Sequence, residues 1–138
     1  MLGYEPPSLS QKALARKASL ELGLISKLEK DGFFHPRSTD KGPRYSSNDL
    51  AIARLLKQLM KLGFDLNKLK FVPETLREMT ETWIESFGDL RRSILKSDTA
   101  LAAGKKIVSI NKELSSLLLQ ELLLQAIIKM QMSSKGRP

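Results

Sequence analysis

The chain contains no cysteine and only one histidine, His35, among its 138 residues. Without a thiol, disulfides, thiolate metal sites and thiol-based redox sensing by this chain are excluded. A single imidazole needs several carboxylates beside it to hold a metal ion, and none cluster around His35 in the sequence. We therefore expect no metal and no cofactor, and a cytoplasmic location is the natural interpretation.

Long apolar runs are also missing. The N-terminus shows no basic segment followed by an apolar one, so a secretory signal is not expected. The leucine-rich stretch near the C-terminus is interrupted by Gln120, Glu121 and Gln125, which argues against a membrane span. The sequence shows no nucleophile–base pair, phosphate-binding loop or metal cluster, so an enzyme is not expected either.

Aromatic residues make up only 6% of the chain, and runs of β-branched residues are scarce. Leu, Lys, Glu and Ala dominate, which predicts a mainly all-α fold. The formal net charge is +8. Residues 1–72 hold 13 Lys and Arg against 7 Asp and Glu, whereas residues 73–138 hold 10 against 8. The basic excess lies in the first half, as expected for a module that faces phosphates, although a solubilising surface charge would look the same.

The first half of the chain shows the signals of two short helices. Ser8 and Gln11 fit a capping box that begins a helix reaching about Lys17. Ser19 is expected to cap a second helix that runs to about Lys30. The second helix is expected to bury one face, made of Leu22, Ile25 and Leu28.

A basic loop and a third helix follow. After Gly32 stops the second helix, Phe33 and Phe34 are expected in a short strand or in the core. Residues 37–44 are rich in turn formers and predict a loop or tight β-hairpin. Ser46 and Asp49 form a second capping box, which opens a helix ending at Gly63, and a short helix follows. This order is that of a winged helix-turn-helix, which makes DNA the first partner to test.

The second half of the chain predicts long helices that begin at Pro73. Gly88 is expected to kink or split the first of them, and Gly104 marks a second break. Trp83 and Phe87 are assigned to the core, with an effector pocket as the alternative. Residues 105–132 are strongly helical and carry a heptad seam with one polar member, which comprises Ile107, Ile110, Leu114, Leu117, Glu121, Leu124 and Ile128.

Further leucines widen the apolar surface of this last helix well beyond a two-stranded seam. A helix that is apolar nearly all round must be buried, and a small chain offers little to cover it except a second copy. We therefore expect a homodimer. The predicted domains are a flexible tail at 1–7, a winged helix-turn-helix at 8–72, a helical dimerisation region at 73–132 and a disordered tail at 133–138.

Four motifs in the first half resemble those of one family. Gln-Lys-Ala-Leu-Ala-Arg at 11–16 is similar to the I-S-E-L-A-K helix of MerR-type regulators, and Glu29-x-x-Gly32-Phe33-Phe34 to their E-x-x-G-L-L. The R-Y-S-x-x-D-L motif of the family stands at 44–50, and L-x-x-L-G-F-x-L at 59–66. The motifs occur in the family's order at nearly its spacings, so residues 11–70 resemble the MerR DNA-binding domain.

Two departures from the family pattern stand in the second helix. Where the family has R-Y-Y-E, this chain has Ser26-Lys27-Leu28-Glu29, and only the glutamate is retained. Where the family has a glycine in the turn, this chain has Ser19. The resemblance implies a dimer whose two wings and two recognition helices bind an inverted repeat in DNA. It also implies regulation by distortion of promoter DNA, with RNA polymerase at the promoter as a further partner.

The DNA-contacting residues expected on the wing are Arg37, Lys41, Arg44 and Tyr45. A guanidinium fork and a phenolic hydroxyl both suit phosphate oxygens, whereas the alternative is that Tyr45 packs on the helices and the cations are solvated. On the helices the candidates are Arg16, Lys17, Glu21, Leu24, Ser26 and Lys27. Arg16 and Lys17 would equally complement the helix dipole. The other four would line the major groove, or form a solvated face.

The sequence thus predicts a homodimeric, sequence-specific DNA-binding regulator of transcription. Two alternatives stay open. A MerR-like domain can serve as a protein-interaction adaptor, which the missing recognition-helix tyrosines favour. A DNA-architectural or segregation protein would bind with little sequence preference.

Overall fold

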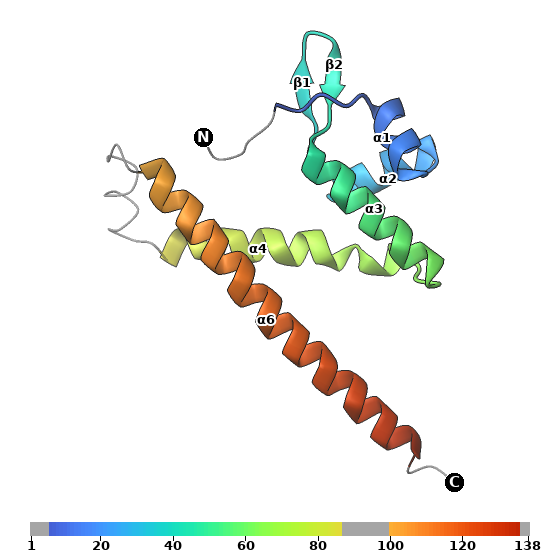
Figure 1. Ribbon diagram of the computed structural model, residues 1–138, viewed down its shortest axis with the longest axis vertical. Coiled ribbons are helices and arrows are strands. Elements are labelled where there is room, and N and C mark those ends of the chain that lie inside the picture. The colour runs from blue at the N-terminus through green and yellow to red at the C-terminus, as the bar shows by residue number, and fades with distance from the viewer. Residues whose placement is uncertain (1–5, 87–99, 136–138) are drawn as a thin grey trace. The chain divides into compact units, whose positions relative to one another are not determined.

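The computed structural model describes residues 6–86 and 100–135 of the chain (Figure 1). The chain divides into two compact units, Met1–Ser86 and Phe87–Pro138. The first unit contains α1, α2, a two-stranded wing, α3, a 3-10 helix and α4, and the described part of the second unit is the long helix α6. The predicted fold, mainly helical with a winged helix-turn-helix and a long helix after it, is confirmed.

Helix α1 spans Gln11–Ala18 and begins at Ser10, whose side chain accepts a hydrogen bond from the Ala13 N–H at 3.1 Å. The predicted cap at Ser8 is therefore wrong. The N–H groups of Ser8 and Leu9 instead donate to the Tyr45 carbonyl oxygen, at 3.2 and 3.1 Å. Because this pairing holds the backbone extended, the helix can start only two residues later.

The turn between α1 and α2 contains a serine in a left-handed conformation. Ser19 has φ 57° and ends α1, while the Leu20 N–H donates to the Ala15 carbonyl at 2.9 Å. The prediction that Ser19 caps the second helix is wrong, because α2 spans Leu22–Lys30 and begins after Glu21 without a side-chain cap. Glycine is the usual residue in this conformation, since a Cβ atom crowds the backbone there.

Helix α2 turns Ile25 and Leu28 fully into the core. The third residue of the predicted buried face, Leu22, is 41% exposed, so that part of the prediction is wrong. Leu24, predicted on the DNA-facing side, packs partly buried against the core instead. The helix is therefore rotated so that Leu24, rather than Leu22, flanks the two buried residues.

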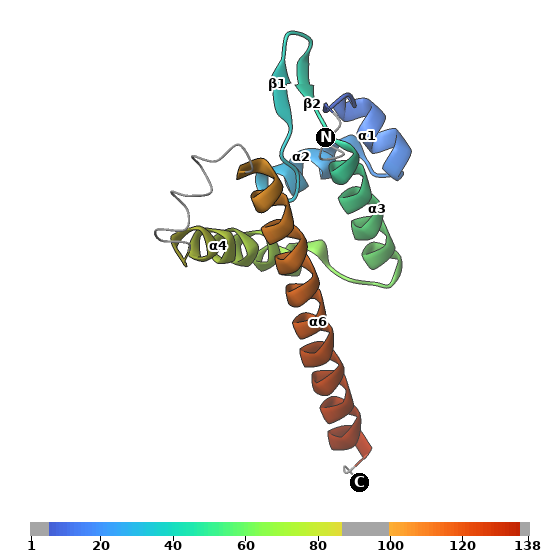
Figure 2. The same cartoon turned by 60° about the vertical axis from the view of Figure 1, so that its left-hand side comes forward.

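The wing consists of β1, Arg37–Thr39, and β2, Gly42–Arg44, paired antiparallel as the sequence predicts. Gly42 has φ +98°, which closes the turn at a position where a side chain would be strained. At the base of the hairpin, Leu9 forms an isolated antiparallel bridge with Tyr45. The hairpin extends away from the helices of its unit (Figure 2).

Helix α3 spans Ser47–Lys61, and its capping box between Ser46 and Asp49 has both predicted hydrogen bonds. A 3-10 helix at Leu66–Leu69 follows, capped by Asp65, and α4 spans Phe71–Ser86. The first unit therefore includes α4, which the sequence analysis grouped with the helical region after residue 72. The core lies among α1, α2, α3 and the base of the wing, and comprises Leu14, Ala15, Ala18, Leu20, Ile25, Leu28, Phe33, Phe34, Tyr45, Ala53, Leu56 and Leu66.

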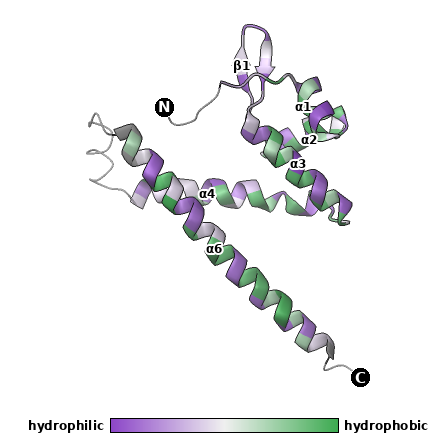
Figure 3. Ribbon diagram, viewed as in Figure 1, coloured by the Kyte–Doolittle hydropathy of each residue, from purple (hydrophilic) through white to green (hydrophobic). Residues whose placement is uncertain are grey.

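Helix α6 spans Ala100–Lys135 without interruption. The predicted break at Gly104 is wrong, because a glycine costs an interior helical position only about 1 kcal/mol and the surrounding helix formers offset it. Apolar residues occupy much of the surface of α6 (Figure 3). Phe87 and Gly88, to which the sequence analysis assigned roles, lie outside the described residues.

Candidate nucleic-acid interface

One buried carboxylate holds both ends of the wing. Asp49 is 4% exposed, and its Oδ2 accepts hydrogen bonds from the Ser46 N–H at 3.0 Å and the Ser46 hydroxyl at 3.2 Å. Its Oδ1 accepts from the His35 N–H at 3.3 Å. His35 precedes β1 and Ser46 follows β2, so the carboxylate of the α3 capping box also orients the hairpin. Hydrogen bonds to a charged acceptor are the stronger kind, which suits this anchoring role.

Tyr45 lies in the core and not on the surface of the wing. It is 1% exposed, its ring meets Phe34 edge to face at 6.4 Å between centroids, and its hydroxyl donates to the Glu29 carboxylate of α2. Burial raises the pKa of Tyr45 far above its ordinary value, and the hydrogen bond and charge of Glu29 raise it further. The expected phosphate contact by this hydroxyl is therefore wrong, and the packing alternative holds.

The wing itself presents two arginines side by side. The register of β1 and β2 pairs Arg37 with Arg44, directly opposite across the hairpin. Residues in opposed positions have their Cβ atoms about 5 Å apart, so both guanidinium groups can reach one anion. The turn that joins the strands is stiffened by Thr39, whose hydroxyl donates to the Gly42 carbonyl at 2.6 Å, and it exposes Lys41. Three cations thus lie on one small protrusion.

Of the candidate DNA-contacting residues on the helices, some are exposed in the structure and others pack against neighbouring elements. Arg16 and Lys17 are exposed in the last turn of α1, and Glu21 is exposed ahead of α2. Ser26, by contrast, accepts a hydrogen bond from Gln11 Nε2 at 3.0 Å and joins α2 to α1. Lys27 is exposed but donates to Asn67 Oδ1 in the 3-10 helix. Ser26 and Leu24 therefore contribute mainly to packing.

The outward surface of α2 includes two residues that the sequence analysis did not propose. Leu22 and Gly23 are both exposed beside Glu21 at the start of the helix, and nothing lies within 4 Å of where a Cβ of Gly23 would be. A glycine on an open helix face lets another backbone approach closely. The helical period alone does not single them out, because Leu22 fits a buried position as well as Leu24 does.

The seam residues of α6 are solvent-facing in the single chain. All seven are exposed except Ile107, which is half-buried. Leu114 and Leu124 are the least exposed of the leucines at 46% and 47%, values far from those of a core residue. Glu121, the polar member, accepts a hydrogen bond from Gln125 Nε2 at 2.9 Å within the same helix.

The described residues lack the features of two other classes of site. They contain no group of three His, Cys, Asp or Glu residues placed to hold a metal ion. Within residues 6–86 and 100–135, no helix has the length and apolarity needed to cross a membrane.

The two helices, the turn between them and the β-hairpin ahead of α3 define a winged helix-turn-helix. Residues 9–72 match the family model described as MerR HTH family regulatory protein. This part of the chain is therefore a MerR-type helix-turn-helix domain, which confirms the resemblance inferred from the four sequence motifs. Comparison with curated proteins and comparison with solved structures each gave no match.

Proposed function

We propose that this protein is a sequence-specific DNA-binding regulator of transcription that acts as a homodimer on an inverted repeat. The observation that carries the proposal is the opposed pair Arg37 and Arg44 on the wing. Two guanidinium groups on one face match the oxygens of a phosphate backbone. The exposed Lys41, Arg16 and Lys17 add positive charge in the same unit.

The homodimer is supported by the apolar surface of α6. Leu117, Leu124 and Ile128 are each about half exposed, at 59%, 47% and 54%. A soluble chain rarely leaves a contiguous apolar surface of this kind uncovered, and a heptad seam is suited to a second helix of the same sequence. Two copies would present two wings and two α2 helices to two half-sites, in the cytoplasm where DNA and promoter-bound RNA polymerase are found.

The proposal is tested by titrating a labelled duplex, carrying candidate inverted repeats recovered by genomic pull-down, at several salt concentrations. Arg44→Ala should weaken binding by about 1–3 kcal/mol, as expected for loss of a charge-assisted hydrogen bond. It should also flatten the log–log salt slope by about 1. Lys61→Ala is the matched control, because it removes one charge from the end of α3 that lies far from the wing (Figure 1).

Three results would contradict parts of the proposal. Equal affinities for the unmutated and Arg44→Ala proteins would remove the wing from the interface. Coating of DNA without one protected repeat would indicate an architectural or segregation protein. Absence of DNA binding even at low salt would favour the protein-interaction adaptor, an alternative supported by Ser26, which packs against Gln11 where the family has an arginine.

A further inference from the structure

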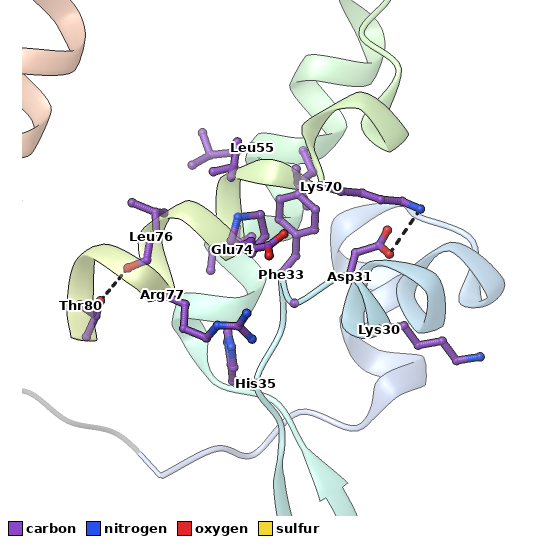
Figure 4. Close-up of a pocket in the computed structure, with 15 residues that line it drawn as sticks. Lys30, Asp31, Phe33, His35, Leu55, Lys70, Glu74, Leu76, Arg77 and Thr80 are labelled. Atoms are coloured by element: carbon purple, nitrogen blue, oxygen red, sulfur yellow. Dashed lines mark hydrogen bonds and ion pairs between the residues drawn. The ribbon is translucent and has the colours of Figure 1, made fainter. Parts of the chain in front are cut away.

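A groove lies between the end of α2, the middle of α3 and the first half of α4, all within the first unit. Its volume is about 900 Å³, within the usual range of roughly 300–1,000 Å³ for small-molecule sites. Phe33 forms part of its floor, and Leu55 and Leu76 line it while remaining 58% and 49% exposed. Figure 4 shows these apolar side chains around the opening. The groove is thus apolar, open and large enough for a small molecule.

Charged side chains surround this apolar floor. Lys70 Nζ and Asp31 Oδ1 lie 3.8 Å apart on one side and neutralise each other. On another side, Arg77 is directed toward His35, while Glu74 lies beside Phe33 between the two sides (Figure 4). Among the described residues, the Arg77 and His35 side chains have no hydrogen-bond or ion-pair partner.

This arrangement selects a particular chemistry. An apolar body on Phe33, Leu55 and Leu76 needs an acidic head at the Arg77 end, because Glu74 repels an anion from the middle and Asp31 is already paired. A guanidinium binds carboxylate or phosphate oxygens in a bidentate manner, and His35 adds a donor beside it. We propose that this groove binds a small anionic amphiphile, with its acid group on Arg77 and its apolar part over Phe33.

A second copy of α6 is the competing occupant. Residues 114–128 of that helix carry one charged side chain, Glu121. Seating this stretch in the groove would desolvate Arg77, Glu74 and the Lys70–Asp31 pair with at most one compensating charge, which is unfavourable. A small acid leaves these charges in water and satisfies Arg77. The charge pattern of the lining therefore favours the small ligand.

The groove is joined to the wing through the backbone of His35. The His35 side chain lines the groove, while its N–H donates to Asp49, the carboxylate that holds both ends of the hairpin. A Cβ atom at Gly32 would come within 3.2 Å of Pro73, so the start of α4 packs closely on the segment leading into β1. A ligand that draws His35 toward Arg77 would shift the wing. This coupling, unlike the binding itself, rests on the proposed DNA-binding function.

The binding experiment uses the full chain and decanoate as the probe, with 1-decanol as the neutral match, followed by calorimetry and by amide chemical shifts. Arg77→Gln should weaken decanoate binding about tenfold or more while leaving decanol binding unchanged. Arg54→Gln, which removes an exposed arginine outside the groove lining, is the control and should bind decanoate normally. Decanoate should shift the amide signals of Phe33 and His35.

Equal decanoate affinity in the Arg77→Gln and Arg54→Gln proteins, or shifts confined to α6, would overturn the site. A change of oligomeric state in Arg77→Gln without any change in decanoate affinity would assign the groove to a second copy. A separate titration of duplex DNA with and without decanoate tests the coupling, and an unchanged DNA affinity would overturn the coupling alone. If decanoate binds as expected but DNA is not bound at all, the proposed function fails and the site stands.

Discussion

The two units of this chain differ in how far their apolar side chains are buried. In the first unit, Leu14 and Ile25 are completely buried, and a further ten residues complete one core. In α6, Leu118 and Leu122 are 56% and 64% exposed, although the helix is at least as rich in leucine. The core of the first unit is closed by α1, α2, α3 and the base of the hairpin, whereas α6 taken by itself has no second layer.

This difference in burial separates a unit that is stable within one chain from a helix whose stability depends on association with a second chain. A unit with its own core folds without a partner, and its free energy of unfolding is a property of one chain. Burying a leucine side chain contributes roughly 1.5–3 kcal/mol to folding. A helix that leaves its leucines exposed forgoes this contribution until a second surface covers them. Its order is therefore expected to depend on protein concentration.

The largest effect should come from charging the α6 seam. Replacing Leu117 and Leu124 together with lysine would place two cations in the proposed dimer contact and should yield monomers or insoluble protein. Light scattering coupled to gel filtration measures the mass. Ser109→Lys with Ser116→Lys adds the same charge off the seam and should leave the dimer intact. A stable monomer for the unmutated chain at micromolar concentration would refute the dimer.

A smaller effect is expected from truncating a core residue of α2. Ile25→Ala removes three buried carbon atoms from a fully enclosed position and should lower the free energy of unfolding by about 2–4 kcal/mol. Leu22→Ala, on the exposed side of the same helix, should cost less than about 1 kcal/mol. Urea denaturation at one fixed protein concentration compares them. If both changes lowered the free energy of unfolding equally, Leu22 would be buried like Ile25, as the sequence analysis predicted and the structure contradicts.

The tyrosine buried at the wing base should matter next. Tyr45→Phe deprives the half-buried Glu29 carboxylate of a donor and should lower the free energy of unfolding by about 1–3 kcal/mol. Adding Glu29→Gln should recover part of that loss, because no unpaired charge then remains. Non-additivity of the two changes in urea denaturation measures the contact, and strict additivity would show that it contributes nothing.

The buried hydroxyl of Tyr45 should make the protein less stable at alkaline pH. Because burial raises the pKa of Tyr45 above its ordinary 10.0, the folded chain retains a proton there that the unfolded chain releases. The folded state binds more protons, so the free energy of unfolding should fall as the pH rises above 10. In Tyr4→Phe protein, which leaves one tyrosine, phenolate absorbance should appear only as the chain unfolds. Ionisation of folded protein near pH 10 would contradict this.

The smallest effect is expected at the left-handed serine between α1 and α2. Ser19→Gly removes the Cβ from a residue with φ 57° and should raise the free energy of unfolding by about 0.5–1 kcal/mol, net of the greater freedom of glycine when unfolded. Ser19→Ala keeps the Cβ and should bring no gain. Melting temperatures measured side by side distinguish the two, and an equal rise in both would show that the conformation carries no strain.

Features that depend on neighbours in the sequence were predictable from the sequence. Ser46 and Asp49 form the capping box because each reaches the other's backbone within one helical turn, and the turn residues at 40–43 close a hairpin of adjacent strands. The four family motifs likewise lie within short windows, so the winged helix-turn-helix class was predictable. The wing cations, namely the exposed Arg37 and Lys41 and the half-buried Arg44, were also identified in this way.

Tertiary contacts decided the features for which the local pattern allowed two answers. Leu24 and Leu22 flank Ile25 and Leu28 at either side, giving apolar arcs of about 100° and about 120°, and only packing in the fold selected Leu24. The local pattern allows Tyr45 to be a surface contact, but in the fold its hydroxyl donates a hydrogen bond to Glu29, sixteen residues away. Ser8 does not cap α1, because its N–H donates to the backbone carbonyl of Tyr45 and holds this segment extended. Each outcome depends on a partner distant in the chain, and a local pattern carries no information about that partner's position.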